Sequence, residues 1–137
     1  MLGLLSHPPS TRYPLPGNAL ERAALAYLHV NCGNCHNNRA VKPALEVHLL
    51  LSVGELATVQ ETAVYRTALG AMTRVANPLE DTAATRIVAP GDPDASLLYL
   101  RMLRRPPSKG QMPNFGTEQV DPEGSTLIAD WIRSLPP

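Results

Sequence analysis

Apolar side chains recur at helical spacing in two long stretches of the chain. The first stretch follows Asn18, which forms the pattern of a capping box with Glu21 three residues later. Its apolar face consists of Leu20, Ala23, Ala24, Tyr27 and Leu28. This spacing predicts a helix that begins near Asn18 and ends around residues 29–31.

A second helical pattern lies at the C-terminal end. Asp121 is a suitable N-cap, and Pro122 and Glu123 are favourable in the first turn of a helix. The apolar positions that follow are Leu127, Ile128, Trp131, Ile132 and Leu135. Because they share one face, we expect an amphipathic last helix whose end is limited by Pro136.

A shorter helix is predicted between these two. Residues 92–94, Asp-Pro-Asp, combine a cap, a proline for the first turn and an acidic side chain near the positive end of the helix dipole. The apolar residues that follow are Leu97, Leu98, Met102 and Leu103. Pro106 and Pro107 stop this helix, and a loop rich in Pro and Gly is expected over residues 106–120.

Residues 40–90 carry a different pattern. Between residues 45 and 51, Leu45, Val47, Leu49 and Leu51 alternate with mostly polar positions, as in a half-buried strand. Residues 58–69 mix β-branched side chains with weak helical spacing and suit either a helix or a strand. Residues 86–88, Arg-Ile-Val, predict a short extended piece.

Length and composition indicate one folded domain. The 137 residues suit a single core, with residues 18–137 as the domain and the proline-rich residues 1–17 as an arm or linker. Apolar residues at 44% and charged residues at 18% are typical of a folded chain. Aromatic residues make up only 4%, which leaves room for a group other than side chains in the core.

Charge and hydropathy exclude several classes of function. Twelve Lys and Arg balance 12 Asp and Glu, so no global charge favours nucleic acid, and we expect no nucleic-acid partner. No apolar run approaches the roughly 18–20 residues of a membrane helix, so we expect no transmembrane segment. No Ser-His-Asp arrangement, phosphate-binding loop or pair of catalytic carboxylates stands in a supporting context, so we expect no separate enzymatic site.

The strongest chemical signal lies at the end of the first predicted helix. Its sequence is Cys32-Gly33-Asn34-Cys35-His36. This is the Cys-X-X-Cys-His signature of c-type haem attachment. Two cysteines three positions apart on a turn can form thioethers with the two vinyl groups of a porphyrin, and the next residue, His36, can then bind the iron. We therefore expect one covalently attached haem c.

Three other interpretations of the two cysteines remain open. A structural zinc site needs four ligands, and with no second cysteine pair it would have to recruit His29, His36 or His48. A thioredoxin-like redox pair needs its first cysteine at a helix N-terminus, whereas these cysteines follow a helix. The third interpretation is a plain disulfide or two free thiols.

A second axial ligand to the iron has several candidates. They are Met72, Met102, Met112, His7, His29 and His48. Met102 falls on an apolar helical stripe, where core packing is its ordinary role. Met112 stands outside any stripe, in a loop where Pro113 restricts the backbone, and this favours it as a ligand. The alternative for Met112 is an incidental loop residue.

The order of these features resembles that of the class I cytochrome c domains. The matching features are the first helix with its Cys-X-X-Cys-His sequence, a later helix, the loop Met112-Pro113-Asn114-Phe115-Gly116 and an amphipathic last helix. The likeness covers residues 18–39 and 92–135. The block from Pro90 to Met112 is similar to cytochrome c domains fused to larger bacterial proteins.

The resemblance implies both the ligand set and the fold. By it, His36 is the proximal ligand, Met112 is the distal ligand, and Cys32 and Cys35 carry the haem. The fold would be mainly α, with the N- and C-terminal helices crossing around the haem through Ala24 and Leu28 on the first and Leu127, Ile128 and Trp131 on the last. Residues 40–90 would form an insertion, longer than the family's usual connection, with room for a β element. Pro43 is a candidate for the carbonyl that orients His36.

Ligation by both His and Met would leave the iron without an open position. The expected function is therefore electron transfer at a moderate to high positive potential, by an electron carrier or relay domain rather than an enzyme. Its partner would be a redox protein or a neighbouring domain of the same polypeptide, and we expect a monomer. A basic cluster could steer an acidic partner, or could simply favour a helix end: Arg101, Arg104, Arg105 and Lys109. Arg39 and Lys42 are weaker candidates for contact with a haem propionate.

Thioether attachment of haem takes place outside the cytoplasm, so we expect a periplasmic or extracytoplasmic protein. The first residues lack the basic and apolar regions of a signal peptide. This is expected if the signal was removed or if the chain is a domain of a larger exported protein. Two other functions remain open: a haem enzyme or gas sensor with a displaceable distal ligand, and a haem-free structural or zinc module.

Overall fold

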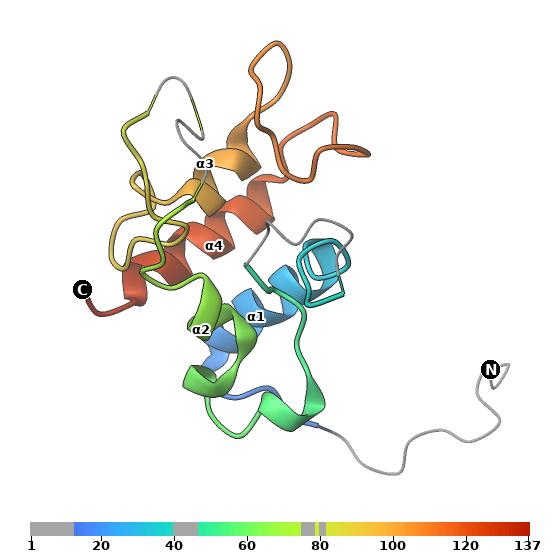
Figure 1. Ribbon diagram of the computed structural model, residues 1–137, viewed down its shortest axis with the longest axis vertical. Helices are drawn as coiled ribbons and strands as arrows, with labels where there is room; N and C mark the ends of the chain where they lie inside the picture. Colours follow the sequence, from blue (N-terminus) through green and yellow to red (C-terminus); the bar gives the residue numbers. More distant parts are fainter. Residues whose placement is uncertain (1–12, 40–46, 75–78, 80–81) are drawn as a thin grey trace, which may run out of the picture.

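The computed structural model describes residues 13–39, 47–74, 79 and 82–137, and over these residues the chain is mainly helical (Figure 1). The helices are α1 (Ala19–Asn31), α2 (Ala63–Thr67), α3 (Leu97–Leu103) and α4 (Pro122–Ser134), with 3-10 turns η1 (Val53–Glu55) and η2 (Val59–Glu61). Within this part of the chain, β pairing is limited to isolated bridges. The expected mainly α class is confirmed. No helix among the described residues has the length and apolar character needed to cross a bilayer.

The predicted start of the first helix is confirmed by its cap. The Asn18 side chain accepts hydrogen bonds from the Leu20 and Glu21 backbone N–H groups, at 2.9 and 3.0 Å. In return, Glu21 Oε2 accepts from the Asn18 N–H at 2.7 Å. This reciprocal capping satisfies N–H groups that would otherwise lack partners in the first turn of α1.

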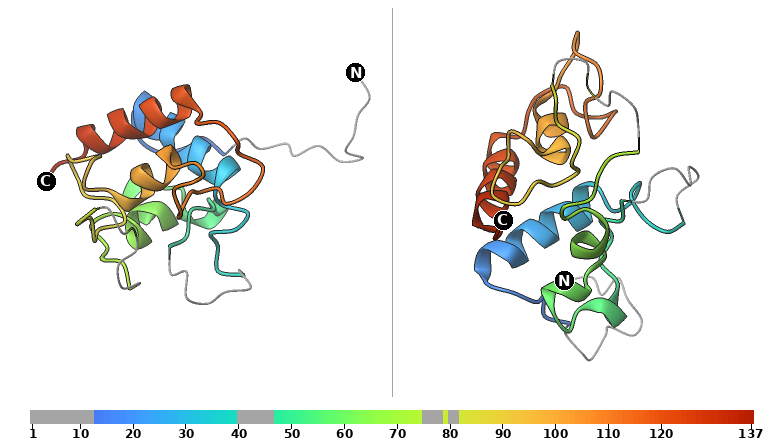
Figure 2. Two further views of the ribbon diagram at one scale, coloured as in Figure 1. Left: turned by 90° about the horizontal axis from the view of Figure 1, so that it is seen from above. Right: turned by 60° about the vertical axis from the view of Figure 1, so that its left-hand side comes forward.

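Helices α1 and α4 pack against each other, and the end of α1 lies beside the start of α4 (Figures 1 and 2). Glycine permits this approach, because a Cβ added at Gly124 would lie 2.3 Å from the Tyr27 ring. The Tyr27 hydroxyl donates to Asp121 Oδ2 at 2.9 Å, which joins α1 to the cap of α4. The predicted packing of the first helix on the last is therefore present.

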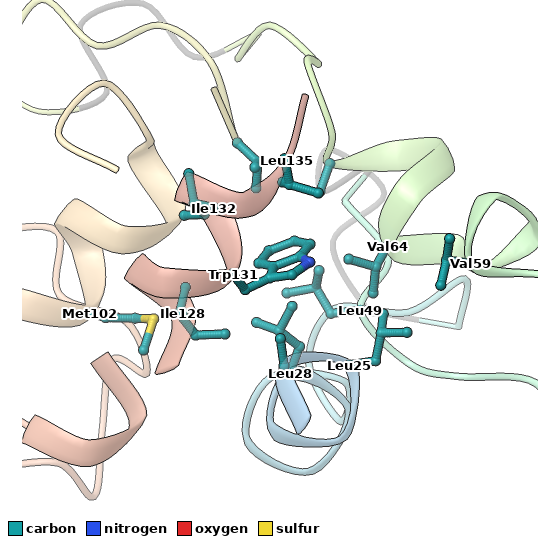
Figure 3. Close-up of a cluster of buried hydrophobic side chains, with 13 residues drawn as sticks. Leu25, Leu28, Leu49, Val59, Val64, Met102, Ile128, Trp131, Ile132 and Leu135 are labelled. Atoms are coloured by element: carbon teal, nitrogen blue, oxygen red, sulfur yellow. The ribbon is translucent and has the colours of Figure 1, made fainter. Parts of the chain in front are cut away.

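The core is centred on Trp131, whose side chain is fully buried (Figure 3). Ala24, Leu28, Ile128 and Trp131 belong to the same buried cluster, as expected, whereas Leu127 is only partly buried. Figure 3 also shows Leu25, Leu28, Leu49 and Val64 gathered around the indole from other elements.

Tyr65 connects three helices around this core. Its ring lies 6.1 Å from the Trp131 ring, centre to centre, at an interplanar angle of 60°. Its hydroxyl donates to Glu21 Oε1 at 3.1 Å and accepts from the Trp131 indole N–H at 3.4 Å. Residues 58–69, which suited a helix or a strand, therefore form η2 and α2 and attach to both α1 and α4.

The strand predicted for residues 45–51 is wrong for residues 47–51, and residues 45–46 lie outside the described part. Leu49 is buried, at 3% exposed, and the other residues of the segment 47–51 are partly buried, but the segment has no strand partner among the described residues. Its N–H groups donate to other acceptors: that of His48 to Thr67 Oγ1 and that of Leu49 to the His36 carbonyl. The alternation of apolar and polar residues thus predicted a half-buried segment correctly, but it did not identify the hydrogen-bond partners of that segment.

The two other local predictions hold in part. Arg86 and Val88 form isolated bridges, in keeping with the extended piece expected there. Helix α3 begins at Leu97 rather than near Asp92, because the Asp92 side chain accepts from the Ala95 N–H and closes a turn before the helix. The helix ends at Leu103, before the two prolines, as expected.

Candidate haem-attachment site

The Cys-X-X-Cys-His sequence forms a compact turn at the C-terminal end of α1. The Cys32 and Gly33 N–H groups both donate to the Leu28 carbonyl, at 2.9 and 3.0 Å. The N–H groups of Cys35 and His36 then both donate to the Cys32 carbonyl, at 3.1 and 2.9 Å. One turn of backbone therefore brings Cys32, Cys35 and His36 together.

Gly33 allows this turn to pack directly against the backbone of Leu50. A Cβ at Gly33 would lie 2.6 Å from the His29 carbonyl oxygen and 2.9 Å from Leu50 Cα. Both are backbone atoms, which cannot move aside as the end of a flexible side chain can. The structure therefore requires a residue without a Cβ at this position.

Both cysteines are free thiols. Burial, with a smaller contribution from the neighbouring Cys35, raises the pKa of the Cys32 thiol to about 11. Cys35 is exposed. Catalytic redox cysteines have lowered pKa values and sit at helix N-termini, so these properties argue against the thioredoxin-like interpretation.

The His36 side chain has the properties of a neutral nitrogen donor. Burial lowers the pKa of its imidazole, and the charges of Arg101 and His48 lower it further. The Val47 backbone lies near the ring and opposes this shift of the pKa, yet Nδ1 is buried without a well-formed hydrogen bond to any described residue. A neutral, half-buried imidazole fits a ligand of haem iron.

The segment 47–51 holds this turn in place. The Leu49 N–H donates to the His36 carbonyl at 2.8 Å, and the Leu51 N–H donates to His29 Nδ1 at 3.0 Å. His29 therefore serves as an acceptor within the fold. Sequence reasoning missed this role, since the acceptor and its donor are far apart along the chain. Pro43, the candidate for orienting His36, lies outside the described residues.

Met112 is partly buried in a loop that several hydrogen bonds close. Its N–H donates to the Arg101 carbonyl at 3.0 Å. The Gln111 side chain donates to both the carbonyl and the hydroxyl of Thr117 at 3.0 Å, and this hydroxyl donates to the Pro113 carbonyl at 2.9 Å. Phe115, at 72% exposed, projects from the same loop.

The competing axial ligands have other surroundings. Met102 is 9% exposed and packs in the main core near Ile128, so its expected role in packing is confirmed (Figure 3). Met72 is 58% exposed. His29 Nδ1 is occupied by the Leu51 N–H, and His7 lies outside the described residues.

The arginines of the predicted basic cluster donate to loop carbonyls. Arg101 donates to the Gly110 carbonyl at 2.9 Å, and Arg104 donates to the Lys109 carbonyl at 3.1 Å. Arg105 donates to the Gln119 carbonyl at 2.6 Å. These side chains therefore support residues 109–119, a structural role that their sequence did not indicate.

The attachment turn and the Met112 loop lie at the same end of the α1–α4 pair, where α1 ends and α4 begins (Figures 1 and 2). Arg101 acts on residues of both: after burial, its charge contributes to the lowered pKa of His36, and its carbonyl accepts a hydrogen bond from the Met112 N–H.

No family model, curated protein or solved structure matches this chain.

The described residues hold no group of three or more His, Cys, Asp or Glu side chains that could bind a metal ion. A structural zinc site is four-coordinate and needs such a group. A haem is compatible with the same residues, because the porphyrin supplies four of the iron's six ligands and the protein only two.

Proposed function

We propose that this chain is a c-type cytochrome domain that transfers electrons through one haem. The haem would be attached to Cys32 and Cys35, with His36 and Met112 as the axial ligands of the iron. The observation that carries the proposal is the attachment turn itself: two free thiols and a neutral, half-buried imidazole within one turn at the end of α1. The resemblance to class I cytochrome c domains in the order of these features supports the same function.

Each residue would contribute differently to this function. The bound haem would supply a one-electron couple between Fe(III) and Fe(II). Cys32 and Cys35 would fix its orientation, and His36 would provide a nitrogen ligand that needs no deprotonation at neutral pH. The Met112 thioether is neutral and favours Fe(II), and a core of Leu, Ile and Trp side chains excludes water, so both raise the potential.

The setting of this electron carrier follows from the same chemistry. Since thioethers to haem form outside the cytoplasm, we place the protein in the periplasm or another extracytoplasmic space. Its partner would be a redox protein or a neighbouring domain of the same polypeptide. Small, salt-dependent contacts are typical of such electron-transfer encounters.

Visible spectra of the exported protein, matured with haem, test the proposal. Wild type should show a low-spin c-type spectrum in both oxidation states and should not bind carbon monoxide when reduced. Met112→Ala should lose one axial ligand, become high-spin and bind carbon monoxide. Met72→Ala is the matched control, because this exposed methionine is 58% accessible and should leave both spectra unchanged.

Three results would contradict the proposal in different ways. Ready binding of carbon monoxide by wild type would favour a gas sensor or haem enzyme with a displaceable ligand. Loss of the low-spin spectrum in Met72→Ala but not in Met112→Ala would move the distal ligand to Met72. A colourless protein would favour the haem-free structural alternative.

A further inference from the structure

Arg101 contacts the Met112 loop with both its backbone and its side chain. Its carbonyl accepts from the Met112 N–H at 3.0 Å, and its guanidinium donates to the Gly110 carbonyl at 2.9 Å. The two loop residues that it holds flank Gln111. Arg101 itself lies in the last turn of α3, so a helix anchors the attachment.

The loop is held on its other side by a separate set of bonds. The Gln111 side chain binds Thr117, and the Thr117 hydroxyl binds the Pro113 carbonyl. These bonds close the loop on itself but do not tie it to a helix. Arg101, by contrast, binds both Gly110 and Met112 and so connects this part of the loop to α3.

We propose that Arg101 is the positioning residue that keeps Met112 on the iron, through the bond from its guanidinium to the Gly110 carbonyl. This inference rests on the proposed function. A hydrogen bond from a charged guanidinium to a carbonyl is stronger than a neutral one, and Arg101 is half-buried, which limits competition by water. Without this bond, residues 110–111 would be freer to move away from α3, and the Met112 thioether would dissociate from the iron more easily.

Competition by added imidazole for the ferric haem measures how readily Met112 leaves. We expect Arg101→Gln to bind imidazole about tenfold more tightly than wild type, the change that corresponds to losing one charge-assisted hydrogen bond. Arg101→Lys keeps a charged donor and should restore most of the wild-type resistance to imidazole. Arg104→Gln is the matched control, because Arg104 makes the same kind of bond to the neighbouring Lys109 carbonyl, farther from Met112.

The outcomes separate this inference from the proposed function. Suppose that wild type is low-spin and does not bind carbon monoxide. If Arg101→Gln then binds imidazole no more tightly than Arg104→Gln, only the role of Arg101 is overturned. If wild type itself binds carbon monoxide or carries no haem, both proposals fail. Should Arg101→Gln not fold, Arg101→Met is compared with Arg104→Met, because methionine keeps an unbranched apolar chain but has no hydrogen-bond donor; equal imidazole affinities for these two would also overturn the role of Arg101.

Discussion

Gly33 shows how a single residue can decide the geometry of the attachment turn. The sequence singles out Cys32, Cys35 and His36 because their spacing is local, and the structure places the three residues within one turn. The sequence could not reveal why the second position is glycine. That reason is a contact with Leu50 across the fold, and contacts between distant residues leave no local pattern.

Gly33→Ala should destabilise the protein by about 1–3 kcal/mol, the usual cost of forcing extra atoms into a packed site. The added methyl would meet backbone atoms of His29 and Leu50, so the turn would have to shift. Chemical denaturation monitored by circular dichroism measures the loss. Gly54→Ala is the control, because nothing lies within 4 Å of a Cβ there. Equal stability of the two variants would show that the turn adapts freely.

At the scale of elements, the sequence predicted the long helices more accurately than the extended segments. Both long helices were predicted with their caps, because a capping box and an Asp-Pro start act within one turn. The start of α3 was placed too early, since Asp92 closes a separate turn with the same chemistry. The segment 47–51 was predicted to be a strand because an alternation of apolar and polar residues does not identify the hydrogen-bond partner.

The bond between Tyr27 of α1 and Asp121 at the start of α4 predicts a loss of stability at high pH. Burial raises the pKa of Tyr27 to about 12, and the bond to Asp121 contributes to the rise. Because the pKa of Tyr27 in the folded protein lies above the usual tyrosine value of 10.0, this contribution to stability is present below pH 10 and disappears as the pH rises toward 12.

Thermal unfolding midpoints of wild type and Tyr27→Phe, measured across this pH range, test the prediction. The phenylalanine variant lacks the ionisable group, so its midpoint should fall less steeply than that of wild type between pH 10 and pH 12. Parallel curves would mean that the Tyr27–Asp121 bond does not link stability to pH.

For the whole molecule, the small aromatic content suggested that a non-protein group contributes to the core. The described part of the chain has one large cluster around Trp131 and a second, smaller one that includes Leu79, Ala84 and Leu97. A covalently held haem would add apolar area and two ligand bonds that only the native state makes. We therefore expect the chain without haem to be much less stable.

The double variant Cys32→Ser, Cys35→Ser removes both attachment points and tests this dependence. Circular dichroism should show weaker helix signal and a lower, less cooperative unfolding transition than in the haem-bearing protein. Cys35→Ser alone keeps one thioether and should fall between the two. Unfolding of the double variant at the wild-type temperature would show that the polypeptide folds without the cofactor.

The fastening of residues 47–51 to the attachment turn also bears on how such a chain can diversify. Leu49 and Leu51 are hydrogen-bonded to the His36 carbonyl and to His29, and Leu50 packs against Gly33. The chain is therefore fixed before it reaches the exposed turn at residues 53–54. Lengthening the chain at that turn adds mainly loop-closure entropy, which grows slowly with length. Evolution can therefore enlarge this region, or insert new sequence into it, while the turn of residues 32–36 keeps its geometry.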